Sequence, residues 1–142
     1  MKTAKRGMIL VVGEHYIFPL KLPASVTSEF WSSPEGHTFK TNLDNALKGA
    51  VESRGHTFYY GAHPRWWDPT YYEVVVTAGT AEASDLVFDA LISAANDQLA
   101  AAGLSGTASV STAGAGAGVQ SWTPLLIGAG IIAALYFIGR AY

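Results

Sequence analysis

The residue types that carry most protein chemistry occur in this chain, but their spacing assembles no familiar catalytic or metal site. There is no cysteine, which excludes disulfides, thiolate nucleophiles, zinc–thiolate sites and iron–sulfur clusters. No pair of histidines has the i and i+4 spacing of a helical metal site, because they stand at His15, His37, His56 and His63. The sequence contains no glycine-rich phosphate loop or nucleophile elbow, and nothing favours a pair of catalytic carboxylates. We therefore predict that the protein is not an enzyme and holds neither a cofactor nor a metal ion.

Aromatic side chains form the richest chemical cluster of the sequence, between residues 58 and 72. Tyrosine and tryptophan rings can stack on sugars, bases or protein surfaces, and Arg65 and Asp68 can add directional hydrogen bonds. The same rings are favoured at a membrane–water interface, while the plainest alternative is burial in the core or against another subunit. We predict an interaction surface made of Tyr59, Tyr60, Arg65, Trp66, Trp67, Tyr71 and Tyr72.

Runs of β-branched and aromatic residues predict the strands that position this cluster. The strongest run is YYEVVVT, which reaches from Tyr71 to Thr77. Pro19 restricts another run to an edge or bulged strand, because proline cannot donate a ladder hydrogen bond. The predicted strands cover residues 8–12, 16–22, 57–60 and 71–77, with a weaker candidate at 105–111.

Apolar residues at helical spacing predict two helices. The first carries a stripe through 43–51, with Thr41 as a possible cap and Gly55 as a stop signal. The second runs over 81–102 and closes at Gly103, with one apolar face and one acidic face. Strands and helices in this order predict an α+β domain, built as a small two-layer sandwich for which the ferredoxin-like arrangement is one candidate.

Turn signals separate these elements. The segment SSPEG at 32–36 predicts a turn, and the segment at 61–69 predicts a loop punctuated by prolines. The tetrapeptide Gly-His-Thr-Phe begins at Gly36 and again at Gly55. Repeat architectures need more than two copies, so we interpret each copy as a turn that leads into an extended segment.

Charge is unevenly distributed along the chain, whose formal net charge is −2. Lys2, Lys5 and Arg6 make the N-terminus basic, whereas no lysine or arginine occurs between Arg65 and Arg140. Proteins that follow a phosphate backbone need clustered cations. The long acidic or neutral half of the chain therefore argues against a nucleic-acid partner.

An uncharged segment at residues 122–139 has the length of a membrane span. At about 1.5 Å per residue, a helix of this length would cross roughly 30 Å of hydrocarbon. Trp122 at one end, with Arg140 and Tyr142 at the other, are typical interfacial residues. We predict a transmembrane helix over 121–142 rather than a buried helix of a soluble core. Its anchoring residues are Trp122, Pro124, Leu125, Leu126, Ile127, Ile131, Ile132, Leu135, Phe137, Ile138 and Arg140.

Small residues in this span predict close packing of the helix with a second copy. In lipid, small side chains four positions apart allow two helices to approach closely. Residues 105–120 are rich in alanine, glycine and serine and predict a flexible linker between the α+β domain at 1–104 and the helix. The predicted helix-packing residues are Ala129, Gly130, Ala133 and Ala134.

These features together predict a non-enzymatic, single-pass, tail-anchored membrane protein. We expect it to be a structural component of a larger assembly, such as a membrane-containing virion or an envelope complex. Its partners would be the lipid bilayer, other proteins of the assembly and a second copy of the chain, in a cellular membrane or the internal membrane of a virion. One alternative is a membrane-tethered module that binds carbohydrate or peptide through Trp66 and Trp67. Another is a lysis or membrane-remodelling factor whose helix oligomerises.

Overall fold

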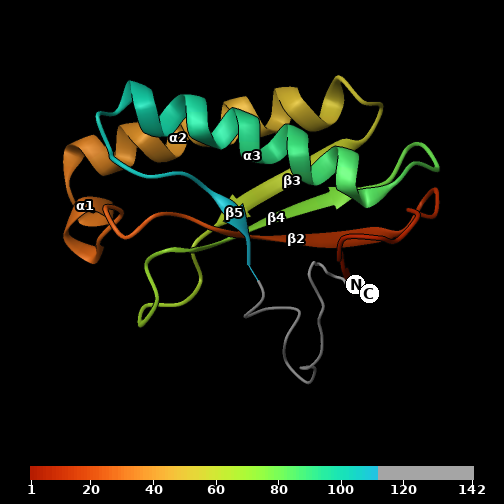
Figure 1. Cartoon of the computed structure of the whole chain (residues 1–142), viewed down its shortest axis with the longest axis horizontal. Helices are drawn as coiled ribbons and strands as arrows, with labels where there is room; N and C mark the ends of the chain where they lie inside the picture. Colours follow the sequence, from red (N-terminus) through yellow and green to blue (C-terminus); the bar gives the residue numbers. More distant parts are fainter. Residues whose placement is uncertain (112–142) are drawn as a thin grey trace. The chain divides into compact units, whose positions relative to one another are not determined.

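The computed structural model of the protein describes residues 1–111. The predicted transmembrane helix at 121–142, with all its anchoring and packing residues, and most of the predicted linker lie outside the described residues. Figure 1 shows the elements in sequence colours. In chain order they are β1 (Lys2–Thr3), β2 (His15–Lys21), α1 (Ser28–Ser32), α2 (Pro34–Glu52), β3 (Thr57–Ala62), β4 (Tyr71–Thr77), α3 (Ser84–Ala101) and β5 (Ser109–Val110).

The strands form one sheet in the order β1-β2-β4-β3, and β5 also pairs with β2. Strand β4 runs antiparallel to both β2 and β3. Strand β1 lies parallel to the beginning of β2, and β5 lies antiparallel to its end. Strand β2 is therefore interior, and its register with β4 is continuous, so the prediction of an edge or bulged strand is wrong.

Pro19 is tolerated in this interior strand because its backbone faces outward. Its carbonyl oxygen accepts a hydrogen bond from the backbone N–H of Ser111 at 3.0 Å. The N–H and C=O of one strand residue point to the same side, so the missing N–H also lies away from β4. Among residues 1–111, the strands that pair with this outer side are the short β1 and β5, so proline breaks no bond of the ladder between β2 and β4.

Helices α2 and α3 lie side by side over one face of the sheet (Figure 1). Alternate residues of β2 and β4 point toward these helices and join the hydrophobic core, as the period of two in a strand requires. The rings of Phe18 and Phe88 meet edge to face in this core, with their centroids 4.9 Å apart. The prediction of an α+β fold with a small sheet and helices is confirmed for residues 1–111. The core residues on the strands are Tyr16, Phe18, Leu20, Tyr72, Val74 and Val76.

The turn predicted at 32–36 is wrong, because this segment begins a helix. The hydroxyl of Ser33 accepts a hydrogen bond from the backbone N–H of Gly36 at 3.0 Å, which caps α2. Pro34 occupies the first helical turn, where its missing N–H has no intrahelical partner to lose. Thr41 is consequently an interior residue of α2 and not its cap. The helix ends at Glu52, ahead of Gly55, which has a φ of 91°.

The prediction of a strand at 8–12 is also wrong, because this segment forms no ladder of hydrogen bonds with another strand in residues 1–111. Only Ile9 forms an isolated bridge, with Ala83. Leu10 is buried, but Val11 begins a turn closed by the N–H of Glu14, with Gly13 at a φ of 88°. The tight turn directly after Leu10 leaves no room for a paired strand.

The folded part extends to Ser111, beyond the boundary predicted at residue 104. Ala108 is 6% exposed, and its backbone N–H donates to Oδ1 of Asn96 at 2.7 Å. Strand β5 thus belongs to the domain and occupies part of the range 105–120 that was predicted as linker. Within residues 1–111, neither long helix combines enough length and hydropathy to cross a bilayer.

Candidate interaction surface

The two neighbouring tyrosines at the start of β4 lie on opposite sides of the sheet. Tyr72 is fully buried in the core beneath the helices. Tyr71 is 2% exposed but does not belong to that core, because successive strand residues point to opposite faces. Tyr71 therefore lies on the face of the sheet that α2 and α3 do not cover.

Tyr59 and Tyr60 are exposed on edge strand β3. A register shift between Phe58 and Tyr60 inserts Tyr59 as an extra residue, which is a β-bulge. The side chains of Tyr59 and Tyr60 are 58% and 52% exposed, and the Tyr59 ring stacks on His15 with centroids 5.7 Å apart. Tyr60 pairs with Val75, which is outside the helix-covered core. The uncovered face of the sheet thus carries aromatic side chains that are open to a partner.

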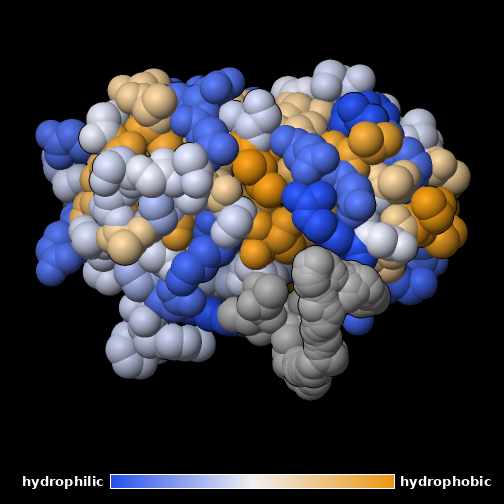
Figure 2. All heavy atoms as spheres, in the orientation of Figure 1, coloured by the Kyte–Doolittle hydropathy of each residue, from blue (hydrophilic) through white to orange (hydrophobic). Residues whose placement is uncertain are grey.

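The loop between β3 and β4, at residues 63–70, carries two strongly exposed large apolar side chains. Trp66 is 84% exposed and Trp67 is 63% exposed. Their rings meet edge to face with centroids 5.7 Å apart. The loop extends from the sheet on the side opposite the helices (Figure 1), and it forms the knob at the lower left of Figure 2.

Contacts at the base of the loop hold its charged residues. The guanidinium of Arg65 lies 3.8 Å from the centre of the Tyr71 ring, and the Tyr71 hydroxyl donates to Glu73 at 2.8 Å. Burial and this bond raise the pKa of Tyr71. The hydroxyl of Thr70 donates to Asp68 at 2.7 Å and is the main cause that lowers the pKa of Asp68. Arg65 and Asp68, which were predicted to form directional hydrogen bonds with a ligand, therefore contact Tyr71 and Thr70 of the protein itself.

Trp31 contacts both ends of the loop. Its indole N–H donates to the carbonyl oxygen of Pro69 at 2.8 Å, and its ring stacks on His63 with centroids 4.1 Å apart and planes 7° apart. Trp31 belongs to α1 and is 6% exposed. It was not predicted as a site residue, because the contact joins positions that are distant in sequence.

A polar cluster beside Trp31 joins α2 to the strands. Lys40 donates to Asp44 at 2.6 Å and to the carbonyl oxygen of Gly61 at 3.1 Å, and the Tyr72 hydroxyl donates to the other Asp44 oxygen. Burial and the nearby Lys40 charge lower the pKa of His63. Lys40, Asp44 and Tyr72 all have partners inside the fold, so this cluster fixes structure and presents no free acid or base. The i,i+4 spacing of Lys40 and Asp44 was the one signal in the sequence for it.

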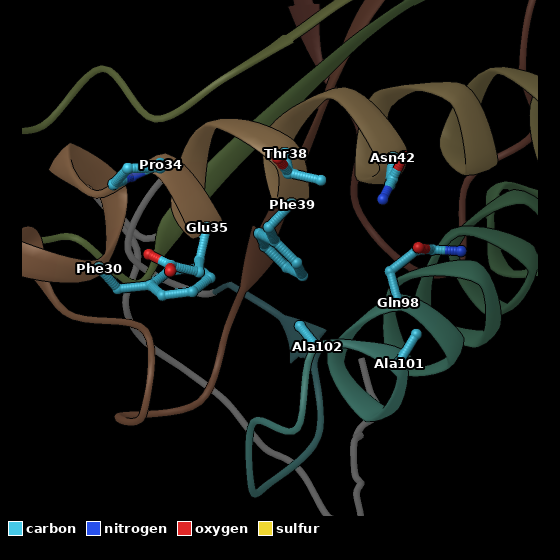
Figure 3. Close-up of a pocket in the computed structure, with 9 residues that line it drawn as sticks. All are labelled: Phe30, Pro34, Glu35, Thr38, Phe39, Asn42, Gln98, Ala101 and Ala102. Carbon is cyan, nitrogen blue, oxygen red and sulfur yellow. The ribbon is translucent and has the colours of Figure 1, made fainter.

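The helical layer carries a groove, shown in Figure 3. It has a volume of about 400 Å³ and lies between α2 and the end of α3. Glu35 is its one charged lining residue, and none of the predicted interaction residues reaches it. In residues 1–111 no three His, Asp or Glu side chains converge closely enough to bind a metal ion. The groove is lined by Phe30, Pro34, Glu35, Thr38, Phe39, Asn42, Gln98, Ala101 and Ala102.

The structure thus separates the predicted interaction residues into three groups. One group is exposed and consists of Tyr59, Tyr60, Trp66 and Trp67. The second is the contacting pair of Arg65 and Tyr71 at the base of the loop, and the third is Tyr72, which lies in the core. Comparison of the chain with protein-family models, curated proteins and solved structures finds no match.

Proposed function

We propose that the protein is a non-enzymatic, membrane-anchored structural component whose exposed aromatic residues dock its α+β domain onto a larger assembly. A membrane-containing virion or an envelope complex is an assembly of this kind. The observation that carries the proposal is the exposure of Trp66 and Trp67 on a loop that Trp31 fixes at both ends. Large apolar rings held rigidly in solvent are typical of contact surfaces, since they bind with little loss of conformational entropy.

The arrangement of strands supports a ferredoxin-like assignment for the domain. Without the short elements β1 and α1, the order is β-α-β-β-α-β, and the sheet order is β5-β2-β4-β3. A domain of this type covers one sheet face with helices and leaves the other available. The assignment itself indicates no activity, because one fold serves many functions.

The remaining parts of the proposal rest on sequence. Residues after Ser111 would form an alanine- and glycine-rich linker and then a transmembrane helix over 121–142, through which two copies could associate. A lysis or remodelling role would depend on that same helix. A carbohydrate- or peptide-binding module is less well supported, because Arg65 and Asp68 are engaged within the loop and the two indoles are not coplanar.

Fractionation of the native assembly or membrane tests this function. We expect the full chain to resist carbonate extraction and a chain that ends at Ser121 to be extracted. We expect Tyr59→Ala with Tyr60→Ala, which removes two exposed rings of β3, to stay in the membrane fraction but to be lost from the assembly after gentle solubilisation. Leu86→Ala is the matched control, since it removes a side chain that is 47% exposed outside the aromatic surface. Retention of the double variant in the assembly would contradict the proposal.

A further inference from the structure

The side chains at the tip of the loop are of the kind that suits a lipid–water interface. Its exposed apolar residues are both tryptophans, and among residues 1–111 no group accepts a hydrogen bond from the indole N–H of Trp66 or Trp67. An exposed indole with a free N–H suits the headgroup region, where its ring meets apolar chains and its N–H meets polar groups. Exposed aliphatic side chains, such as those of Ile9 and Val12, belong to other segments of the domain and not to this loop.

Charges around the loop are balanced. Lys21 and Arg65 both lie near enough to Asp68 to lower its pKa, and Glu73 binds the Tyr71 hydroxyl beneath Arg65. A surface with equal numbers of cations and anions exerts little net attraction on a phosphate backbone or an acidic peptide. A zwitterionic bilayer surface requires no such net charge.

The side of the sheet from which the loop extends also supports contact with a membrane. The loop and the last described residues extend from the sheet on the side opposite the helices (Figure 1). Residues 112–121 separate this domain from the uncharged segment that begins at Trp122. Even fully extended, a chain of this length reaches at most about 35 Å, which is comparable to the width of a small domain. A domain anchored by that segment would therefore stay next to the bilayer.

We infer that the Trp66–Trp67 loop docks into the lipid headgroup region of the membrane in which the chain is anchored. The inference rests on the proposed function, and it names the bilayer as the immediate partner of this loop. Tyr59 and Tyr60 on β3 remain for contacts with proteins of the assembly. The fixation of the loop by Trp31 allows both indoles to enter the interface with little further ordering.

Quenching by brominated lipid tests the docking directly. The full chain with Trp122→Phe is reconstituted into phosphatidylcholine vesicles, with and without bromine on the acyl chains. We expect bromine to cause a clear loss of tryptophan emission, because only Trp66 and Trp67 can reach the lipid while Trp31 is buried. In the same background, Trp66→Phe with Trp67→Phe should abolish the loss. Both side chains are exposed, and an unchanged circular dichroism spectrum would show that the variant is folded.

The outcomes separate this inference from the proposed function. A chain that resists carbonate extraction but shows no quenching overturns the docking, and its loop is then left for a protein partner. A chain that carbonate removes from the vesicles overturns the anchored function on which the inference rests. Quenching that survives the double phenylalanine substitution also overturns the docking, since other residues would then approach the lipid.

Discussion

At the scale of single residues, Glu82 connects three parts of the domain. Its carboxylate accepts hydrogen bonds from Arg54 at 2.7 and 3.1 Å and from Nε2 of His56 at 2.6 Å. Nδ1 of His56 accepts a hydrogen bond from the backbone N–H of Gly79 at 3.0 Å. An imidazolium could not accept that bond, so the geometry assigns a neutral His56 with its proton on Nε2. The bonds from Arg54 are the main cause that lowers the pKa of Glu82, and the bond from His56 adds to them.

Replacement of Glu82 by glutamine should destabilise the domain at neutral pH. His56 is buried, and a weakened acceptor at Nε2 should cost about 1–3 kcal/mol of unfolding free energy. Because folding lowers the pKa of Glu82, the carboxylate stabilises the fold fully above the pKa of an unfolded glutamate, about 4.3. This stabilisation is lost as the pH falls through the lower pKa of the folded state. Urea unfolding of the full chain in mild detergent, at pH 7 and pH 3, should show a difference between wild type and variant that shrinks at pH 3.

Glu52→Gln is the control for this measurement. Glu52 is exposed at the end of α2, and its side chain has no hydrogen-bond or ion-pair partner among residues 1–111. Its substitution should leave the unfolding free energy within about 0.5 kcal/mol of wild type. Equal stabilities of wild type and Glu82→Gln at pH 7 would show that the interactions of this carboxylate do not stabilise the fold.

At the scale of elements, the two copies of Gly-His-Thr-Phe show what a local pattern can predict. The copy at Gly55 forms a turn into β3, as predicted. The copy at Gly36 lies inside α2, where the cap at Ser33 and the apolar stripe through Phe39 impose helical structure. The same four residues thus adopt two structures, because the neighbouring cap and core decide between them.

Strand prediction succeeded for the run at 71–77 and failed for the run at 8–12. Every residue of the run at 71–77 is buried or half-buried in a strand that pairs on both sides, and its predicted bounds match β4. The run at 8–12 has similar composition, but only Leu10 is buried, and within residues 1–111 its only pairing is the isolated bridge from Ile9 to Ala83. Composition alone cannot distinguish these cases, since a strand is stable only when a partner completes its hydrogen bonds.

The candidate surface was predictable only in part, for the same reason. Local composition located the aromatic cluster, and alternation in YYEVVVT could have separated Tyr71 from Tyr72. The role of Trp31 was not predictable, because its hydrogen bond to Pro69 spans 38 positions. The shape of the loop therefore depends on a helix that the sequence pattern did not reveal.

Replacement of Trp31 by phenylalanine should loosen this loop while the core stays folded. Phenylalanine can still stack on His63 but cannot donate to Pro69, and the lost hydrogen bond should cost about 1 kcal/mol. Hydrogen exchange of the amides of Asp68 and Tyr71, which form the internal bonds of the loop, should become roughly fivefold faster. Trp66→Phe is the matched control, because this ring makes no hydrogen bond in residues 1–111, and it should leave both rates unchanged. Unchanged exchange in Trp31→Phe would show that Trp31 does not hold the loop.

At the scale of the whole molecule, the position of β5 determines where the folded domain ends. Composition placed the boundary at residue 104, because the residues that follow are small and polar. Backbone hydrogen bonds instead tie this segment to the domain, from Ala108 to the Asn96 side chain at 2.7 Å and from Ser111 to Pro19 at 3.0 Å. Val110 also packs against the core. A segment with weak propensity becomes a strand here because the outer side of β2 offers it unpaired groups.

Two truncated chains distinguish these boundaries. A chain that ends at Ser111 retains every core residue described here and should unfold cooperatively, as a small single domain does. A chain that ends at Leu104 loses Ala108 and Val110, and the buried apolar area lost with them should lower its unfolding free energy by at least about 2 kcal/mol. Loss of the Ser111 N–H, which donates to the carbonyl oxygen of Pro19, would also leave the outer edge of β2 open to aggregation. Urea unfolding and sedimentation of both chains measure these effects. Equal stability of the two chains would place residues 105–111 outside the cooperative unit and would return the boundary to residue 104.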